Sequence, residues 1–175
     1  GIAAASKSYF LAQTVDWAYD ISGLVDSMSL LREYDIIQGV RPGEFSWRTL
    51  RSRSDSIYKG IVSLTNYTLI RVLFGLPFDD FQNVTLCPTA LAQALPLESE
   101  GSFTNPEVMM KLYWGGASFV QVAVPFQKRS KGRGTGTRFG QIARSIRDIF
   151  AHWLRWVVLS RYPRRGGGSV SSRYR

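Results

Sequence analysis

The chain has 175 residues, 45% of them hydrophobic and 13% aromatic, which predicts one buried core and therefore one domain or part of one. Its 22 Lys and Arg outnumber its 13 Asp and Glu, and this net charge of +9 predicts an anionic partner. The single cysteine excludes an internal disulfide, and the single histidine excludes a site built from several histidines. The sequence has no apolar run of about eighteen residues, so it predicts no membrane-spanning helix.

The first predicted strand is residues 9–15 (YFLAQTV), which follow a segment, 1–8, typical of the end of a helix. The strand ends at two carboxylates, Asp16 and Asp20. An open α/β sheet presents ligands at the edge where its strands end, and a divalent cation there can bridge carboxylates and a diphosphate. The run therefore predicts a site for Mg²⁺ or Mn²⁺. In the alternative interpretation, Asp16 only ends the strand and Asp20 caps the following helix.

Three elements follow in the first half of the chain. The apolar stripe of residues 22–33 predicts a helix. Residues 34–40 (YDIIQGV) predict a second strand, closed by a turn that begins at Arg41. Residues 56–74 predict a long helix, because Gly75 and a proline two positions later are typical stop signals. Arg41 is therefore expected at the same sheet edge as the acidic end of the first strand.

The middle of the chain begins with an acidic turn and the apolar run 84–95. The apolar neighbours of Cys87 predict a buried, unreactive thiol. A helix is predicted over residues 106–114, with Asn105 as its cap. Glu107 is interpreted mainly as an acid that complements the dipole in the first turn of that helix. Strands that alternate with helices predict an α/β fold with a mixed sheet.

The last third of the chain predicts a strand over 117–126, a Gly-rich basic loop over 127–140, and an amphipathic helix over about 141–159. Its apolar stripe consists of Ile142, Ile146, Ile149, Phe150, Trp153, Leu154 and Val157. Basic amphipathic helices that carry Trp lie on anionic membranes, but an apolar stripe also serves to pack a helix on its own sheet. Both interpretations stay open.

The excess of positive charge is local. Residues 128–175 hold 13 Lys and Arg and one acid, Asp148, whereas the preceding residues are close to neutral. A nucleic-acid-binding face interleaves basic residues with exposed aromatic ones, but the aromatic residues here fall in apolar stripes. The predicted anionic partners are therefore phosphorylated substrates or an acidic membrane surface, and no nucleic acid.

In this order, four segments resemble family 2 glycosyltransferases, most closely the polyprenyl-phosphate (dolichol-phosphate) sugar transferases: YFLAQTVDWAYD, YDIIQGVR, KGIVSLTNYTLIRVLFGLPFDD and SFTNPEVMMKLYWGGASFVQVAVPFQKRSKGRGTG. The resemblance covers roughly residues 1–160 and lacks the N-terminal half that holds the nucleotide. It implies an incomplete three-layer mixed sheet of the nucleotide-diphospho-sugar transferase type. Residues 1–140 would be the C-terminal part of the catalytic domain, 141–163 the amphipathic helix and 164–175 a flexible basic tail.

The resemblance also implies roles for acidic residues. The family's metal motif is Asp-x-Asp-x-Gln, and its three ligand positions hold Asp16, Ala18 and Asp20 in this sequence. Asp16 and Asp20 are thus the implied ligands of Mg²⁺ or Mn²⁺, although the middle carboxylate is missing. Asp80, in the acidic turn near the donor sugar, is with Asp16 an implied catalytic residue. An ordinary turn between a helix and a strand would also favour Asp at that position.

Four residues are implied to bind the acceptor phosphate: Arg41, Lys59, Ser63 and Arg129. Lys59 and Ser63 are four positions apart and share a helix face, and Arg129 lies in the Gly-rich loop, whose backbone N–H groups can face a phosphate. Alternatively, these cations are ordinary surface charges.

The implied reaction is the inverting transfer of a sugar from a nucleotide-diphosphate donor to a polyprenyl phosphate at the cytoplasmic face of a membrane. Because the acceptor phosphate is itself anionic, the reaction needs positioning and charge stabilisation more than a strong base. Residues 1–175 alone are expected to be inactive. The alternative is a degenerate, non-catalytic domain that binds a membrane surface or a partner.

Overall fold

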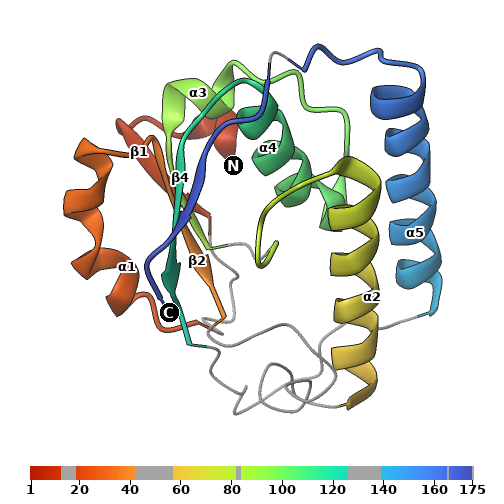
Figure 1. Ribbon diagram of the computed structural model, residues 1–175, viewed down its shortest axis with the longest axis horizontal. Helices are drawn as coiled ribbons and strands as arrows, with labels where there is room; N and C mark the ends of the chain where they lie inside the picture. The colour runs from red at the N-terminus through yellow and green to blue at the C-terminus, as the bar shows by residue number, and fades with distance from the viewer. Residues whose placement is uncertain (13–18, 42–56, 82–83, 126–138, 165, 175) are drawn as a thin grey trace.

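The computed structural model describes residues 1–12, 19–41, 57–81, 84–125, 139–164 and 166–174. Within these residues five strands form one mixed sheet in the order β1-β3-β2-β4-β5 (Figure 1). The strands are β1 (Tyr9–Ala12), β2 (Ile36–Val40), β3 (Thr85–Pro88), β4 (Phe119–Ala123) and β5 (Val170–Ser172). Strand β3 is antiparallel to both β1 and β2, whereas β2, β4 and β5 are parallel. The prediction of an α/β fold with a mixed sheet is confirmed.

Helices cover both faces of the sheet (Figure 1). One face carries α2 (Ile57–Phe74), α4 (Thr104–Trp114) and α5 (Phe139–Trp153), and its core includes Ile36, Phe74, Met109 and Phe119. The other face carries α1 (Ser22–Asp26), whose Leu24 packs with Ile37 and Val120. Successive residues of β2 thus point to opposite cores, and the strand is apolar on both sides because both sides are buried.

Short elements complete the fold. They are the 3-10 turns η1 (Ile2–Ala4), η2 (Met28–Arg32) and η4 (Gly101–Phe103), the helix α3 (Thr89–Gln93) and the π-helical turn η5 (Leu154–Val158). Residues 1–8, expected to end a helix, contain η1 instead, and the run 84–95 divides into β3 and α3 at Pro88.

Two predicted helices differ from the observed ones. The segment 22–33 is interrupted at Ser27, whose hydroxyl donates to the carbonyl of Gly23 at 2.6 Å and so competes with the helical backbone bonds. Helix α4 begins at Thr104, directly after η4, so Asn105 lies inside the helix and is not its cap. The predicted helix over 56–74 is confirmed as α2, which is followed by Gly75 at φ +64°.

The segment 164–175 is not merely a flexible tail, because its residues Val170–Ser172 form β5 against the edge of β4. The glycines before β5 make this approach possible. A Cβ atom on Gly168 would lie 1.9 Å from the carbonyl oxygen of Ala117, so only glycine fits there. The sequence pattern that suggested flexibility thus serves close packing.

The predicted C-terminal helix consists of α5 followed by η5. Part of its apolar stripe is buried in the core and part of it is exposed. Ile149 is fully buried in the core, whereas Phe150 and Leu154 are exposed. Among the described residues, no helix combines the length and the apolar character needed to cross a membrane.

The prediction of a buried thiol is confirmed, because Cys87 is fully buried and burial raises its pKa to about 12. We expect the native protein to react with iodoacetamide at neutral pH roughly 1000-fold more slowly than the urea-unfolded protein, since only the thiolate reacts. Mass spectrometry of timed samples measures both rates. Comparable rates would mean that β3 opens readily to solvent.

Candidate functional site

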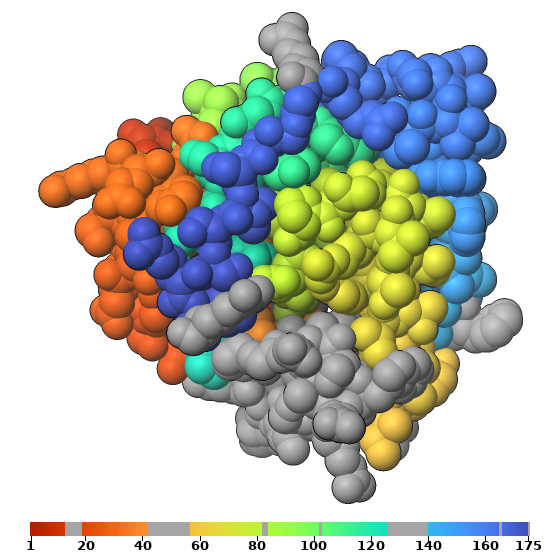
Figure 2. All heavy atoms as spheres, in the orientation of Figure 1, coloured from red at the N-terminus to blue at the C-terminus, as the bar shows by residue number. Residues whose placement is uncertain are grey.

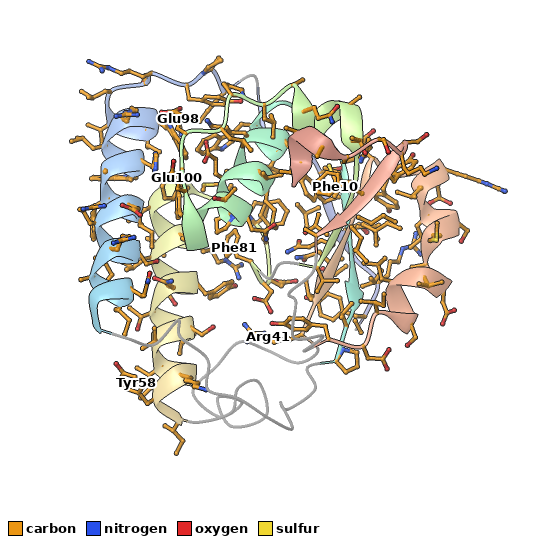
Figure 3. The ribbon with its side chains drawn as sticks, turned by 180° about the vertical axis from the view of Figure 1, so that it is seen from behind. Phe10, Arg41, Tyr58, Phe81, Glu98 and Glu100 are labelled. Carbon is orange, nitrogen blue, oxygen red and sulfur yellow. The ribbon has the colours of Figure 1, made fainter. Side chains whose placement is uncertain are left out.

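Arg41 directly follows β2 (Figure 3). It forms a buried ion pair with Asp80. Arg41 donates from Nε to Oδ2 of Asp80 at 2.8 Å and from Nη2 to Oδ1 at 3.1 Å, the two-pronged geometry that suits a guanidinium and a carboxylate. The side chains are only 6% and 2% exposed. Burial by itself would lower the pKa of Arg41, but the Asp80 carboxylate outweighs it and raises that pKa.

The sheet and the acidic turn hold this pair in place. The backbone N–H of Val124 donates to the carbonyl of Val40 at 2.8 Å, so the ends of β2 and β4 are joined beside Arg41. The carbonyl of Asp80 accepts a hydrogen bond from Nε2 of Gln38 at 2.6 Å. Phe78 anchors the same turn, because it is fully buried with its ring 4.9 Å from that of Phe119.

Helix α2 brings Ser63 to the ion pair. Nη2 of Arg41 lies 3.5 Å from Oγ of Ser63, at the long limit of a hydrogen bond. Lys59 lies one helical turn earlier on the same side of α2, and both side chains are half-buried. The structure therefore brings Arg41, Ser63 and Asp80 together, with Lys59 in the adjacent turn.

Asp20 lies beside the end of β4. Its backbone N–H donates to the carbonyl of Pro125 at 3.1 Å, and its Oδ1 accepts from the backbone N–H of Ser22, the first residue of α1, at 3.0 Å. The hydrogen bonds from the backbone and side chain of Ser22 lower the pKa of Asp20. The cap residue of α1 is Ile21, not Asp20, but the Asp20 carboxylate accepts from the first N–H of the helix and is kept ionised by that contact. Pro125 follows Val124, which bonds to the last residue of β2, so Asp20 and the end of β2 both lie where β4 ends.

Two predicted site residues, Asp16 and Arg129, lie outside the described residues, as does Ala18. Within the described ranges, no three His, Cys, Asp or Glu side chains converge as a metal site would require. Asp20 would therefore contribute a single carboxylate to a metal site. Such a site would need further ligands from elsewhere to be complete.

A buried pair of amides in the sheet was not anticipated from the sequence. Gln38 of β2 and Gln121 of β4 are both fully buried, in register, and their side chains meet at 2.9 Å. The Gln121 amide also lies 3.3 Å from the hydroxyl of Ser172, and Ser172 donates that hydroxyl to Asp79 at 3.2 Å. A glutamine within an apolar strand, present in both YDIIQGV and SFVQVAV, is the sequence signal for such a pair, because buried amides need partners.

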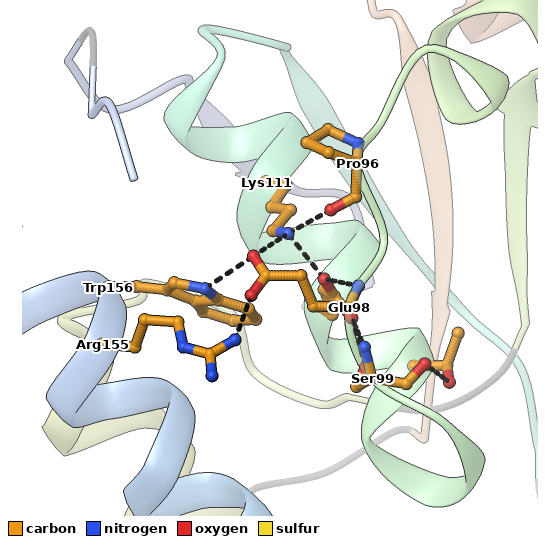
Figure 4. Close-up of polar contacts among 8 residues, drawn as sticks. Pro96, Glu98, Ser99, Lys111, Arg155 and Trp156 are labelled. Carbon is orange, nitrogen blue, oxygen red and sulfur yellow. Dashed lines mark hydrogen bonds and ion pairs between the residues drawn. The ribbon is translucent and has the colours of Figure 1, made fainter. Parts of the chain in front are cut away.

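A second polar cluster joins α4 to η5 (Figure 4). Nζ of Lys111 lies 2.6 Å from Oε1 of Glu107, 3.2 Å from Oε1 of Glu98 and 2.5 Å from the carbonyl of Pro96. Nε1 of Trp156 donates to Glu98 at 3.0 Å, which fastens η5 to this cluster. Figure 3 shows Glu98 at the opposite end of the molecule from Arg41. The cluster therefore serves packing, and Glu107 does more there than complement a helix dipole.

No model of a known protein family matches this sequence, and no curated protein matches it either. The likeness to family 2 glycosyltransferases consequently rests on the quoted segments alone. The structure adds one observation to this likeness: Arg41 is buried, is held by the carboxylate of Asp80 and lies next to Ser63 of α2.

Proposed function

We propose that this chain forms the acceptor side of a glycosyltransferase that moves a sugar from a nucleotide-diphosphate donor to a polyprenyl phosphate with inversion. The observation that carries the proposal is the Arg41–Asp80 pair next to Ser63 and one turn from Lys59. A cation held rigidly by a buried carboxylate is pre-organised to receive an anion, because little side-chain freedom is lost on binding.

Each residue has a distinct part in this proposal. The two-pronged pair with Asp80 fixes the guanidinium of Arg41, whose positive charge orients the acceptor phosphate. Ser63 supplies a hydroxyl and Lys59 a point charge from the same side of α2. Asp80 fixes Arg41, and Arg129 joins the set from the basic loop. The phosphate oxygen attacks the anomeric carbon without a strong base, because it is already anionic.

Asp20 and Asp16 would hold the divalent cation, which, when bound, neutralises the leaving diphosphate. The lowered pKa of Asp20 agrees with this part, because a metal ligand must be deprotonated. The test of the function is transfer of radiolabelled sugar to polyprenyl phosphate by the intact protein. Transfer should stop with EDTA and return with Mg²⁺ or Mn²⁺.

A second candidate is a domain that binds polyprenyl phosphate without catalysis. Ala18 favours it, because this residue stands where the family has its middle carboxylate. The same assay separates the two candidates: an intact protein that retains polyprenyl phosphate but transfers no label from any nucleotide sugar supports the second and contradicts the first.

Lys59→Ala is expected to raise the KM for polyprenyl phosphate about tenfold while kcat and the KM for the donor change little, because one charge-assisted contact to the acceptor is lost. Initial rates at varied acceptor concentration measure the effect. Lys7→Ala, a change of the same type at an exposed position near the N-terminus, is the control. Equal effects of the two substitutions would remove Lys59 from the acceptor site.

A further inference from the structure

The outer face of α2 is nearly uncharged. The exposed residues of this helix are Ile57, Tyr58, Ile61, Thr65, Thr68, Arg71 and Val72, and a single one of them carries a charge. Val72 is 71% exposed, and Tyr58 points away from the sheet (Figure 3). A helix with one face in water normally presents charged residues there, so this face has the composition of a surface that is covered.

The C-terminal helix adds a second exposed apolar row. Phe150, Leu154 and Val158 follow one another at intervals of four and are 44%, 48% and 52% exposed. Their neighbours Ile149 and Trp156 are already buried in the core, so this row is not needed to attach the helix to the sheet. Rows at such intervals share a helix face.

The two rows belong to neighbouring helices. Figures 1 and 2 show α2 and α5 side by side along one end of the molecule, and Nδ2 of Asn66 donates to Oγ of Ser145 between them at 3.1 Å. We call their exposed apolar residues the α2–α5 face. It comprises Ile57, Tyr58, Ile61, Val72, Phe150, Leu154 and Val158.

Arginines outnumber acids on the C-terminal helix that carries half of this face. In the described range 139–164 the exposed basic residues are Arg144, Arg147, Arg155, Arg161 and Arg164, and the one acid is Asp148. Two of these arginines have ion-pair partners, because Arg147 pairs with Asp148 at 3.0 Å and Arg155 with Glu98 at 2.6 Å. A covering partner should therefore offer an apolar interior beneath an anionic surface. A second copy of the chain is disfavoured, because it also carries +9 and two such faces would bring positive charge together.

We infer that the α2–α5 face docks on the surface of a bilayer that contains anionic lipids. Its apolar side chains enter the boundary between headgroups and acyl chains, and the arginines contact the headgroups. This inference does not depend on the proposed sugar transfer. However, α2 also carries Lys59 and Ser63. Docking of α2 would therefore bring these two residues to the level of the lipid phosphates.

The test is sedimentation of the full chain with phosphatidylcholine vesicles that contain about 30% phosphatidylglycerol, and with vesicles of phosphatidylcholine alone. We expect binding to the anionic vesicles to be at least about tenfold stronger, and the double substitution Phe150→Glu, Leu154→Glu to weaken it by about tenfold or more. The control is Val25→Glu, Met28→Glu, which makes the same change at residues 52% and 50% exposed on the α1 side of the sheet.

Three results would overturn the inference. They are equal binding to both kinds of vesicle, equal effects of the two double substitutions, and a dimer in lipid-free solution that Leu154→Glu separates into monomers. Light scattering detects the last. Circular dichroism verifies the fold of each variant, and Thr68→Glu on the exposed side of α2 repeats the test if the α5 variant does not fold.

Discussion

Asp80→Ala is expected to lower the free energy of unfolding by about 3 to 5 kcal/mol, because it leaves the buried Arg41 charge without its carboxylate. A loss of that size is a large part of the roughly 5 to 15 kcal/mol that keeps a domain folded. Urea unfolding followed by circular dichroism measures it. Under the proposed function, sugar transfer by the intact protein also falls to background, since Arg41 is no longer held in place.

The neighbouring Asp79 provides a matched control. Its side chain is 31% exposed, accepts hydrogen bonds from Ser172 and Tyr174 and lies 3.9 Å from Arg71, so Asp79→Ala should cost about 1 to 2 kcal/mol, less than the loss of a fully buried charge partner. The double variant Arg41→Ala, Asp80→Ala should lose less than the sum of its two single variants, because neither charge is then left alone. If Asp80→Ala and Asp79→Ala cost the same, the Arg41–Asp80 pair does not stabilise the site.

Lys111→Met is the second large effect, with an expected loss of about 3 to 5 kcal/mol at neutral pH. Lys111 and Glu107 are both fully buried, and the substitution keeps the length of the side chain while removing the cation that balances Glu107. Arg155→Met is the control, since Arg155 pairs with Glu98 at 2.6 Å but is 53% exposed and should cost at most about 1 kcal/mol.

The effect of Lys111→Met should also depend on pH. Burial alone would raise the pKa of Glu107, but the bonds from Lys111, Ser99 and the backbone outweigh burial, so its pKa lies below the ordinary value of 4.5. In the native protein this carboxylate therefore adds stability above the unfolded pKa, and that stability is lost as the pH falls through the lower folded pKa. Without Lys111, burial raises the pKa, and protonation then favours the folded variant. The difference in stability should narrow between about pH 7 and about pH 4, and a constant difference would contradict this account.

Local signals in the sequence predicted the elements that depend on local chemistry. Helix α2 ends where Gly75 and the following proline require it to end, and β2 is evident as an apolar run. The division of 22–33 at Ser27 and the strand β5 were not predicted. The first depends on one side-chain hydrogen bond, and the second depends on a pairing with β4 about fifty residues away in the chain.

The candidate site was predictable in composition more than in contacts. Arg41, Ser63 and Asp80 were all named from the sequence, but no local pattern links Arg41 to a carboxylate 39 residues further on. Gln38 and Gln121 became visible as partners only when the sheet order made β2 and β4 neighbours. Asp16 and Arg129 remain predictions.

Strand β5 also has a consequence for solubility. Strand β4 is apolar and buried, and without β5 its row of backbone donors and acceptors would be open to strands from other molecules. The segment that pairs with this edge reads Val-Ser-Ser-Arg. It satisfies the backbone hydrogen bonds of β4, and because it is short and mostly polar, its own outer edge favours pairing with other strands less. Residues 170–172 thus keep the edge of β4 from pairing with strands of other molecules.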